Sequence, residues 1–375
     1  MSTPPALFQP LQLRELTLKN RVVVSPMCQY SADHGVPNDW HLVHLGRFAL
    51  GGAGLVFAEA TAVEPEGRIS AADTGLYNDE QQASFTRIVR FLKEQGAATA
   101  VQLAHAGRKA STRAPWLGGG PASAEQARNG ETWTPRAPSA LPFTEGFPVP
   151  RELTKADLAE IKASFVASAA RALAADFDVL EVHAAHGYLL TQFLSPISNQ
   201  RTDEYGGDRE ARMRWPLELI QEVRAAWPAA RPLFVRISAV DGTEGGWSLE
   251  DSVAFGHELK ALGVDAIDCS SGGVTPSIAT IPDPKQHGYQ VPFAQRIKRE
   301  VGIPTMTVGR ITDPELANAI VQGGSADLVA LARPLLDDPN WALHAREVLW
   351  PEGLGDSAYP RQVGYAVKAL KRAPR

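Results

Sequence analysis

The feature that most constrains the fold is the repeated alternation of short apolar runs with helical segments along the 375-residue chain. The runs are rich in Val, Leu, Ile and Ala without a regular apolar–polar alternation, which is typical of parallel strands buried on both faces. This pattern predicts an α/β fold, a single (β/α)8 TIM barrel spanning residues 1–375. The runs are 21–27, 54–60, 98–105, 178–184, 232–238, 265–271, 304–309 and 327–333; the helical segments are 38–52, 79–96, 153–175, 210–227, 248–263 and 312–324.

An open, doubly wound sheet is the alternative architecture. Such a sheet usually carries a GxGxxG turn after its first strand, and here the first run continues into SPMCQY instead. The long interval between the third and fourth strands is dense in Pro and Gly. It is either a mobile surface loop or a lid over the barrel mouth, and we favour a capping insertion at 111–150, because long loops in compact domains are usually functional.

Composition excludes several classes of function. The net charge is −5 and no basic run stands out, which disfavours a nucleic-acid partner. No stretch approaches the roughly 20 apolar residues of a membrane span, so we expect no membrane association. The first residues do not read as a signal peptide, and the two cysteines, Cys28 and Cys269, make no disulfide framework. We therefore expect a cytoplasmic protein with reduced thiols.

Polar residues at the carboxyl ends of the predicted strands mark the candidate site, because active sites of these barrels lie there. Loops after the seventh and eighth strands usually hold a phosphate, which Gly309, Arg310, Ala332 and Arg333 would contact here. A structural salt bridge is the alternative role for Arg333. The other strand-end residues are Pro26, Met27, Cys28, Tyr30, Glu59, Ala60, Thr61, Gln102, His105, Arg108, Lys109, Arg236, Ser270 and Ser271.

The fourth strand ends in EVHAAHGY, which places His183, His186 and Tyr188 within six residues. A zinc site is one reading, although the spacing and the missing third ligand differ from the HExxH pattern, and we expect no metal. A hydrogen-bonded core network is a second reading. A third is a pair of imidazole N–H groups that polarise one carbonyl oxygen, with Tyr188 delivering a proton to a neighbouring carbon.

These motifs resemble the old yellow enzymes, FMN-dependent ene reductases, and most closely their bacterial thermophilic-like or xenobiotic-reductase branch. The similarity covers essentially the whole chain in the right order. One departure is Ala211, within DREAR (208–212), where the family commonly has Asn; we expect it to affect only a local turn. The matching stretches are NRVVVSPMCQYSA (20–32), DWHLVHLGRFALGGAGLVFAEATAVEPEGR (39–68), QLAHAGRKAS (102–111), EVHAAHGYLLTQFLSPISNQRTDEYGG (181–207), TVGRITDPE (307–315) and LARPLLDDPNW (331–341).

The resemblance implies roles for these residues. Gln102 would bind the pyrimidine edge of non-covalently bound FMN, Arg236 would lie near its N1–C2=O end, and the Cys28 thiol would tune its potential, with a small buried filler as the alternative role. The remaining FMN contacts would come from Ser25, Pro26, Met27, Ala60, Gly309, Arg310, Ala332 and Arg333, and the substrate contacts from Tyr30, Lys109, Trp116, His183, His186 and Tyr188.

The implied reaction is ping-pong. NADPH or NADH reduces FMN, and an α,β-unsaturated carbonyl or nitro compound then takes hydride from flavin N5 at its β-carbon and a proton from Tyr188. The alternatives are a quinone, nitroaromatic or nitrate-ester reductase, and a flavin redox sensor without physiological turnover. The branch also implies a homodimer or homotetramer, in which Arg361 of a C-terminal tail, 351–375, enters a neighbouring pocket; a plain surface arginine is the alternative.

Overall fold

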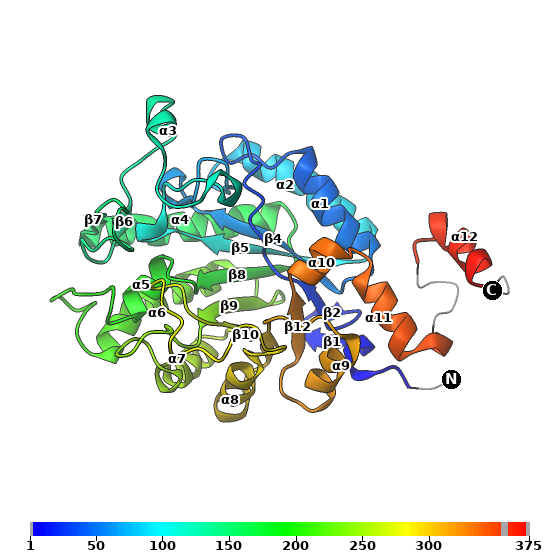
Figure 1. Ribbon diagram of the computed structural model, residues 1–375. Coiled ribbons are helices and arrows are strands. Elements are labelled where there is room, and N and C mark those ends of the chain that lie inside the picture. Colours follow the sequence, from blue (N-terminus) through cyan, green and yellow to red (C-terminus); the bar gives the residue numbers. More distant parts are fainter. Residues whose placement is uncertain (1–2, 354–358, 373–375) are drawn as a thin grey trace.

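The computed structural model describes residues 3–353 and 359–372, and in these residues eight parallel strands close into a barrel surrounded by helices (Figure 1). Consecutive strands are neighbours, and the last strand pairs with the first through Ala330 opposite Val23. All eight expected strands are present, so the predicted TIM barrel is confirmed and the open sheet is excluded. They are β3 (Val22–Val24), β4 (Leu55–Ala62), β5 (Ala98–Ala104), β8 (Val179–Ala184), β9 (Leu233–Ser238), β10 (Ala266–Ser270), β11 (Thr305–Thr307) and β12 (Leu328–Leu331).

The helices cover the outside of the barrel and include the six segments expected from periodicity (Figure 1). Helix α8 was not predicted, although Phe293, Ala294, Ile297 and Val301 recur at helical spacing and are buried. Thr154 and Asp157 form the expected reciprocal cap. The helices are α1 (Asp39–Leu50), α2 (Asp79–Glu94), α3 (Ala124–Arg128), α4 (Lys155–Ala174), α5 (Leu189–Leu194), α6 (Arg209–Ala226), α7 (Leu249–Ala261), α8 (Val291–Val301), α9 (Pro314–Gln322), α10 (Arg333–Asp337), α11 (Trp341–Leu349) and α12 (Arg361–Arg372).

The barrel strands are buried on both faces, which explains why their sequences do not alternate. Side chains such as Val23, Phe57, Phe234 and Met306 form one apolar cluster with the antiparallel hairpin β1 (Leu11–Leu13) and β2 (Leu16–Leu18). A second, larger cluster packs the strands against the helices. The interior is therefore a packed core, and polar residues are left to the carboxyl ends of the strands.

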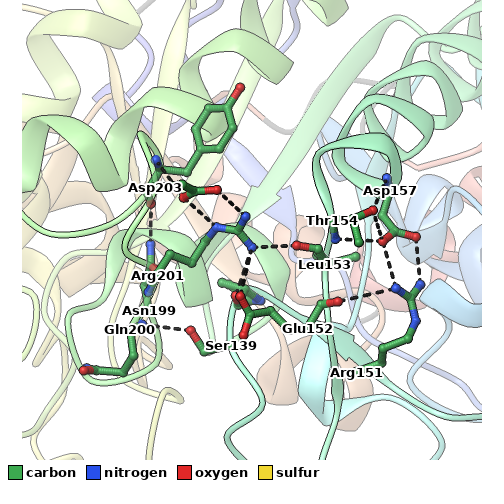
Figure 2. Close-up of polar contacts among 12 residues, drawn as sticks. Ser139, Arg151, Glu152, Leu153, Thr154, Asp157, Asn199, Gln200, Arg201 and Asp203 are labelled. Carbon is green, nitrogen blue, oxygen red and sulfur yellow. Dashed lines mark hydrogen bonds and ion pairs between the residues drawn. The ribbon is translucent and has the colours of Figure 1, made fainter.

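The insertion between β5 and β8 carries α3, which projects away from the barrel (Figure 1). Its closing end is fixed where the short parallel strands β6 (Arg136–Ala137) and β7 (Arg151–Glu152) pair. Arg201, from the loop after α5, donates to the Leu153 carbonyl oxygen at 2.6 Å, and Arg151 binds Asp157 through its two terminal guanidinium nitrogens (Figure 2). Arg201 also donates to the Pro138 carbonyl oxygen at 3.1 Å. These bonds tie the base of the insertion to the rim of the barrel.

Two further observations concern the surface. Among the helices that the structure describes, none combines the length and the apolar character needed to cross a bilayer. The C-terminal helix α12, which begins at Arg361, lies apart from the barrel beyond α11 (Figure 1). Within this one chain, Arg361 is therefore not brought to the barrel mouth.

Candidate active site

His183 is the fifth residue of β8, next to Arg236 of β9 in the sheet register. Its Nδ1 accepts a hydrogen bond from the Ala185 amide at 3.2 Å, so the ring proton resides on Nε2. Burial, followed by the charges of Arg236 and Lys109, lowers the pKa of His183 well below its ordinary value. The imidazole is therefore neutral at neutral pH and presents one N–H donor.

His186 lies in the turn after β8 with a left-handed backbone, at φ +59°. Its ring meets that of His183 edge to face, with the centroids 5.1 Å apart. Burial also lowers its pKa well below the ordinary value. The Nε2 atom lies 2.7 Å from Ser270 Oγ at the end of β10. The two histidines thus converge, as the sequence predicts, but Ser270 already binds one nitrogen of the pair, as in the core-network reading.

Tyr188 precedes α5, and its ring centroid lies 5.1 Å from that of His183. Burial, followed by Cys28 and Tyr30, raises the pKa of its phenol well above the ordinary value. The Lys109 ammonium lies 5.1 Å from the centroid of the same ring. Tyr188 therefore holds its proton at neutral pH, next to the His183 imidazole, as a general acid must.

Cys28 and Tyr30 follow β3 on the opposite side of the mouth. Burial raises the pKa of the Cys28 thiol well above its ordinary value, with further contributions from Asp73 and Glu59. The thiol is thus neutral, unlike the thiolate of a nucleophilic cysteine. Tyr30 packs edge to face on Trp116 of the insertion, with centroids 5.7 Å apart. Trp116 is 66% exposed, so it borders the mouth from outside.

Glu59 of β4 binds the backbone of the loop that carries Cys28. The carboxylate oxygen Oε2 accepts from the Gln29 amide at 3.1 Å and lies 3.7 Å from Nε2 of the buried His41. Burial, followed by Asp73, raises the pKa of Glu59 well above its ordinary value. Burial thus favours the protonated, neutral form of this carboxyl group.

This protonation state gives a testable pH dependence. Because the native pKa exceeds the unfolded one, the folded state binds more protons, and stability falls as pH rises above the ordinary range of a glutamate. Glu59→Gln keeps the acceptor for the Gln29 amide and removes this slope. We expect a free energy of unfolding within about 1 kcal/mol of wild type at pH 5, and a gain relative to wild type that appears as the pH rises to 7 and above. Thermal unfolding from pH 5 to 9 measures both, with the exposed Glu145→Gln as control. A loss of several kcal/mol at pH 7 would contradict a neutral Glu59.

A buried polar row crosses the middle of the mouth. Gln102 Nε2 donates to Glu181 Oε1 at 2.8 Å. Arg236 Nε lies 2.9 Å from Asp268 Oδ2, a close ion pair that lacks hydrogen-bond alignment, and its Nη1 donates to Ser25 Oγ at 3.4 Å. Burial, followed by Asp268, raises the pKa of Glu181 well above its ordinary value. This row brings together the side chains of Ser25, Gln102 and Arg236.

A cavity of about 560 Å³ adjoins this row at the ends of β11 and β12. The cavity is lined by Arg236 and Ser270, by the segments 308–312 and 330–334, which include Gly309, Arg310, Ala332 and Arg333, and by Tyr289, Gln290 and Asp337. Gly309 has φ +129°, and a Cβ atom there would meet the Tyr289 ring at 3.1 Å, so a glycine suits this close approach. The donors and the volume fit an extended polar cofactor with a terminal anion.

Residues 6–350 match the NADH:flavin oxidoreductase / NADH oxidase family. The chain belongs to this family. It is 45% identical over 346 residues to an NADPH dehydrogenase of Geobacillus thermodenitrificans (strain NG80-2), with 92% of this chain and 94% of the relative covered. The resemblance to the old yellow enzymes is confirmed, and with it an FMN-dependent oxidoreductase that takes electrons from a nicotinamide nucleotide.

Solved structures of this type share the fold. Morphinone reductase superposes with a TM-score of 0.76 at 28% identity, covering 92% of this chain and 90% of that chain. A 2-naphthoyl-CoA reductase superposes with a TM-score of 0.81, covering 92% of this chain, and this chain spans about half of it, 52%. At 23% identity the second likeness shows the fold alone.

The structure also brings in residues that the sequence analysis did not single out. Ser238 ends β9 and binds the His186 amide, and Tyr289 and Gln290 line the cavity before α8. The sequence marks these three residues only weakly. Ser238 is distinguished by its position at the end of a strand, and the other two residues carry no such mark. In the described residues no group of three or more His, Cys, Asp or Glu side chains is arranged to hold a metal ion.

Proposed function

We propose that this enzyme is an ene reductase that uses NADPH to reduce activated C=C bonds of α,β-unsaturated carbonyl and nitro compounds. The choice of NADPH follows the name of the Geobacillus relative. Bound FMN would supply the redox chemistry, carrying a hydride equivalent from the nicotinamide to the β-carbon of the substrate.

We propose that FMN lies across the buried polar row with its phosphate in the cavity. Gln102 and Arg236 would face the flavin ring, and the Arg236 guanidinium would favour the negative charge that collects on reduction. The Cys28 thiol, being neutral, would adjust the flavin environment without attacking substrate. The backbone of Pro26, Met27 and Ala60 would line the ring. The phosphate contacts would come from Gly309, Arg310, Ala332 and Arg333, which line the cavity.

The observation that carries the proposal is the grouping of two neutral imidazoles with a protonated phenol beside this cavity. Neutral imidazoles donate to a carbonyl oxygen and stabilise the negative charge that develops there. Tyr188 then gives its proton to the α-carbon, next to the carbon that receives hydride. Tyr30, Lys109 and Trp116 would surround the bound substrate.

We further propose that the enzyme is a homo-oligomer in which Arg361 of a second copy completes the site. Two observations support a second copy of the chain as the partner of α12. Arg361 begins α12, which lies apart from its own barrel, and α12 exposes Val363 and Tyr365 (Figure 1). Trp40 and Val43 on α1 are likewise more than half exposed and lie one helical turn apart.

A direct test is anaerobic reduction of the purified, FMN-loaded protein with NADPH, followed by 2-cyclohexenone. We expect bleaching of the flavin absorbance by NADPH and its full return on addition of the enone, with cyclohexanone as product. A nitroaromatic, a quinone and a nitrate ester in parallel measure the other acceptor classes. If the enone fails to restore the absorbance while a quinone does so rapidly, the ene reductase proposal is wrong.

A further inference from the structure

The turn that carries His186 is packed backbone to backbone against the turn after β10. A Cβ atom on Gly187 would lie 2.0 Å from the Gly273 carbonyl oxygen, and one on Gly273 would lie 2.4 Å from the His186 carbonyl carbon. Neither position tolerates a side chain, so the two turns approach as closely as main chains can. The position of the His186 ring therefore depends on what holds these turns together.

Two side chains bridge the turns, and each bonds a different group of His186. Ser238 Oγ accepts from the His186 amide at 2.8 Å and donates to the Gly272 carbonyl oxygen at 2.8 Å. Lys109 Nζ donates to the His186 carbonyl oxygen at 2.7 Å and to the Gly273 carbonyl oxygen at 3.1 Å. Both polar groups of the His186 backbone are thus fixed, on opposite sides of the residue, to consecutive residues of one turn.

These bonds compensate a local conformational cost. A residue other than glycine in the left-handed region, as His186 is, persists only where its surroundings determine it. Lys109 stands after β5 and Ser238 ends β9, so the bridges come from the strands on either side of β8 in the barrel. The ring centroids of Phe143 and Tyr188 lie 4.6 and 5.1 Å from the Lys109 ammonium.

We propose that Lys109 and Ser238 form a clamp that positions His186 for catalysis. The clamp fixes the direction of the His186 imidazole relative to His183 and thereby the place where the acceptor oxygen is held. This role rests on the proposed function of the imidazole pair. This role differs from a direct substrate contact, and Ser238 distinguishes the two. Ser238 is 3% exposed and lies beneath the turn, so it acts on His186 and not on the substrate.

The clamp predicts that Lys109→Met and Ser238→Ala share two effects. Amide exchange in peptides covering 186–189 and 272–274 should accelerate, because the bonds that hold these turns are lost. The affinity for para-hydroxybenzaldehyde, measured by the perturbation of the flavin spectrum, should fall about tenfold or more, as expected for a misplaced binding group. The FMN content of both purified variants should stay close to that of wild type, because neither bridge is part of the buried polar row.

Lys260→Met is the matched control, since Lys260 Nζ also donates to a backbone carbonyl, that of Val301 at 2.8 Å, between α7 and α8. It should leave exchange at both turns and phenol affinity unchanged. Wild-type exchange and phenol affinity in Ser238→Ala would overturn the clamp, whatever Lys109→Met does. Amide exchange is measured without substrate, so it tests the clamp independently of the reaction. An enzyme that reduces no enone would refute the proposed function, and the exchange data would still decide the clamp. Should Lys109→Met fail to fold, Ser238→Ala alone decides.

Discussion

Replacing Tyr188 by Phe is expected to reduce the rate at which 2-cyclohexenone reoxidises the NADPH-reduced enzyme by about 10² to 10⁴, the usual contribution of a positioned general acid. Phe preserves the edge-to-face contact with His183 and removes only the hydroxyl group. The pKa of Tyr188 is raised by burial, so the wild-type phenol carries its proton at neutral pH, and Phe has no proton to give. Stopped-flow absorbance separates flavin reduction from reoxidation.

The first half of the reaction supplies the internal control for this prediction. Reduction by NADPH requires no proton at the substrate α-carbon, so its rate in Tyr188→Phe should stay within a few-fold of wild type. Acceptors that need no carbon protonation, such as quinones, should also react nearly normally. Tyr205→Phe, which removes a hydroxyl group next to Glu218, controls for general effects on folding. Equal slowing of both half-reactions would point to a role in shaping the pocket and against proton transfer.

Loss of either imidazole is expected to weaken both acceptor binding and reactivity. Removing one donor from an oxyanion-binding pair costs about 10² to 10³ in rate. We therefore expect His183→Ala and His186→Ala each to slow enone reoxidation by that factor. Their affinity for para-hydroxybenzaldehyde, whose phenolate resembles the enolate formed during reduction, should fall in parallel.

The double variant distinguishes a shared oxygen site from two separate roles. If both rings donate to one oxygen, His183→Ala/His186→Ala should lose less than the product of the single effects, because the first loss already displaces the acceptor. His34, whose side chain is almost fully exposed, gives the control His34→Ala. Unchanged phenol affinity with a lowered melting temperature in the single variants would favour the core-network reading, to which the Ser270 contact belongs.

Much of the barrel was predictable because its signals are local. Each buried strand is a continuous apolar run, and Thr154 with Asp157 marks a helix start within four residues. The helix α8 was missed because it follows a loop rich in Pro and Gly, although its apolar spacing is regular. The hairpin of β1 and β2 was missed because its strands, LQL and LTL, each place a polar residue between two leucines and so form no continuous apolar run.

The candidate site was predictable where residue type and strand position coincide. His183 and Tyr188 share one motif, and Gln102 and Arg236 are polar residues within apolar strands. The contacts that fix the site were not predictable in this way. Lys109 and Ser238 are 129 residues apart in sequence, and their shared bond to His186 depends on two turns that meet only in the folded barrel. Ser270 binding to His186 Nε2 likewise follows from the fold.

The measurement that tests the central claim most directly is a crystal structure of the FMN-loaded enzyme soaked with para-hydroxybenzaldehyde. We expect its phenolate oxygen within hydrogen-bond distance of both His183 and His186, its ring stacked on the flavin, and Arg361 of a second copy beside it. A phenol bound elsewhere, or imidazoles turned away from a flavin that is present, would contradict the account; an otherwise intact site without Arg361 would refute only the oligomer proposal.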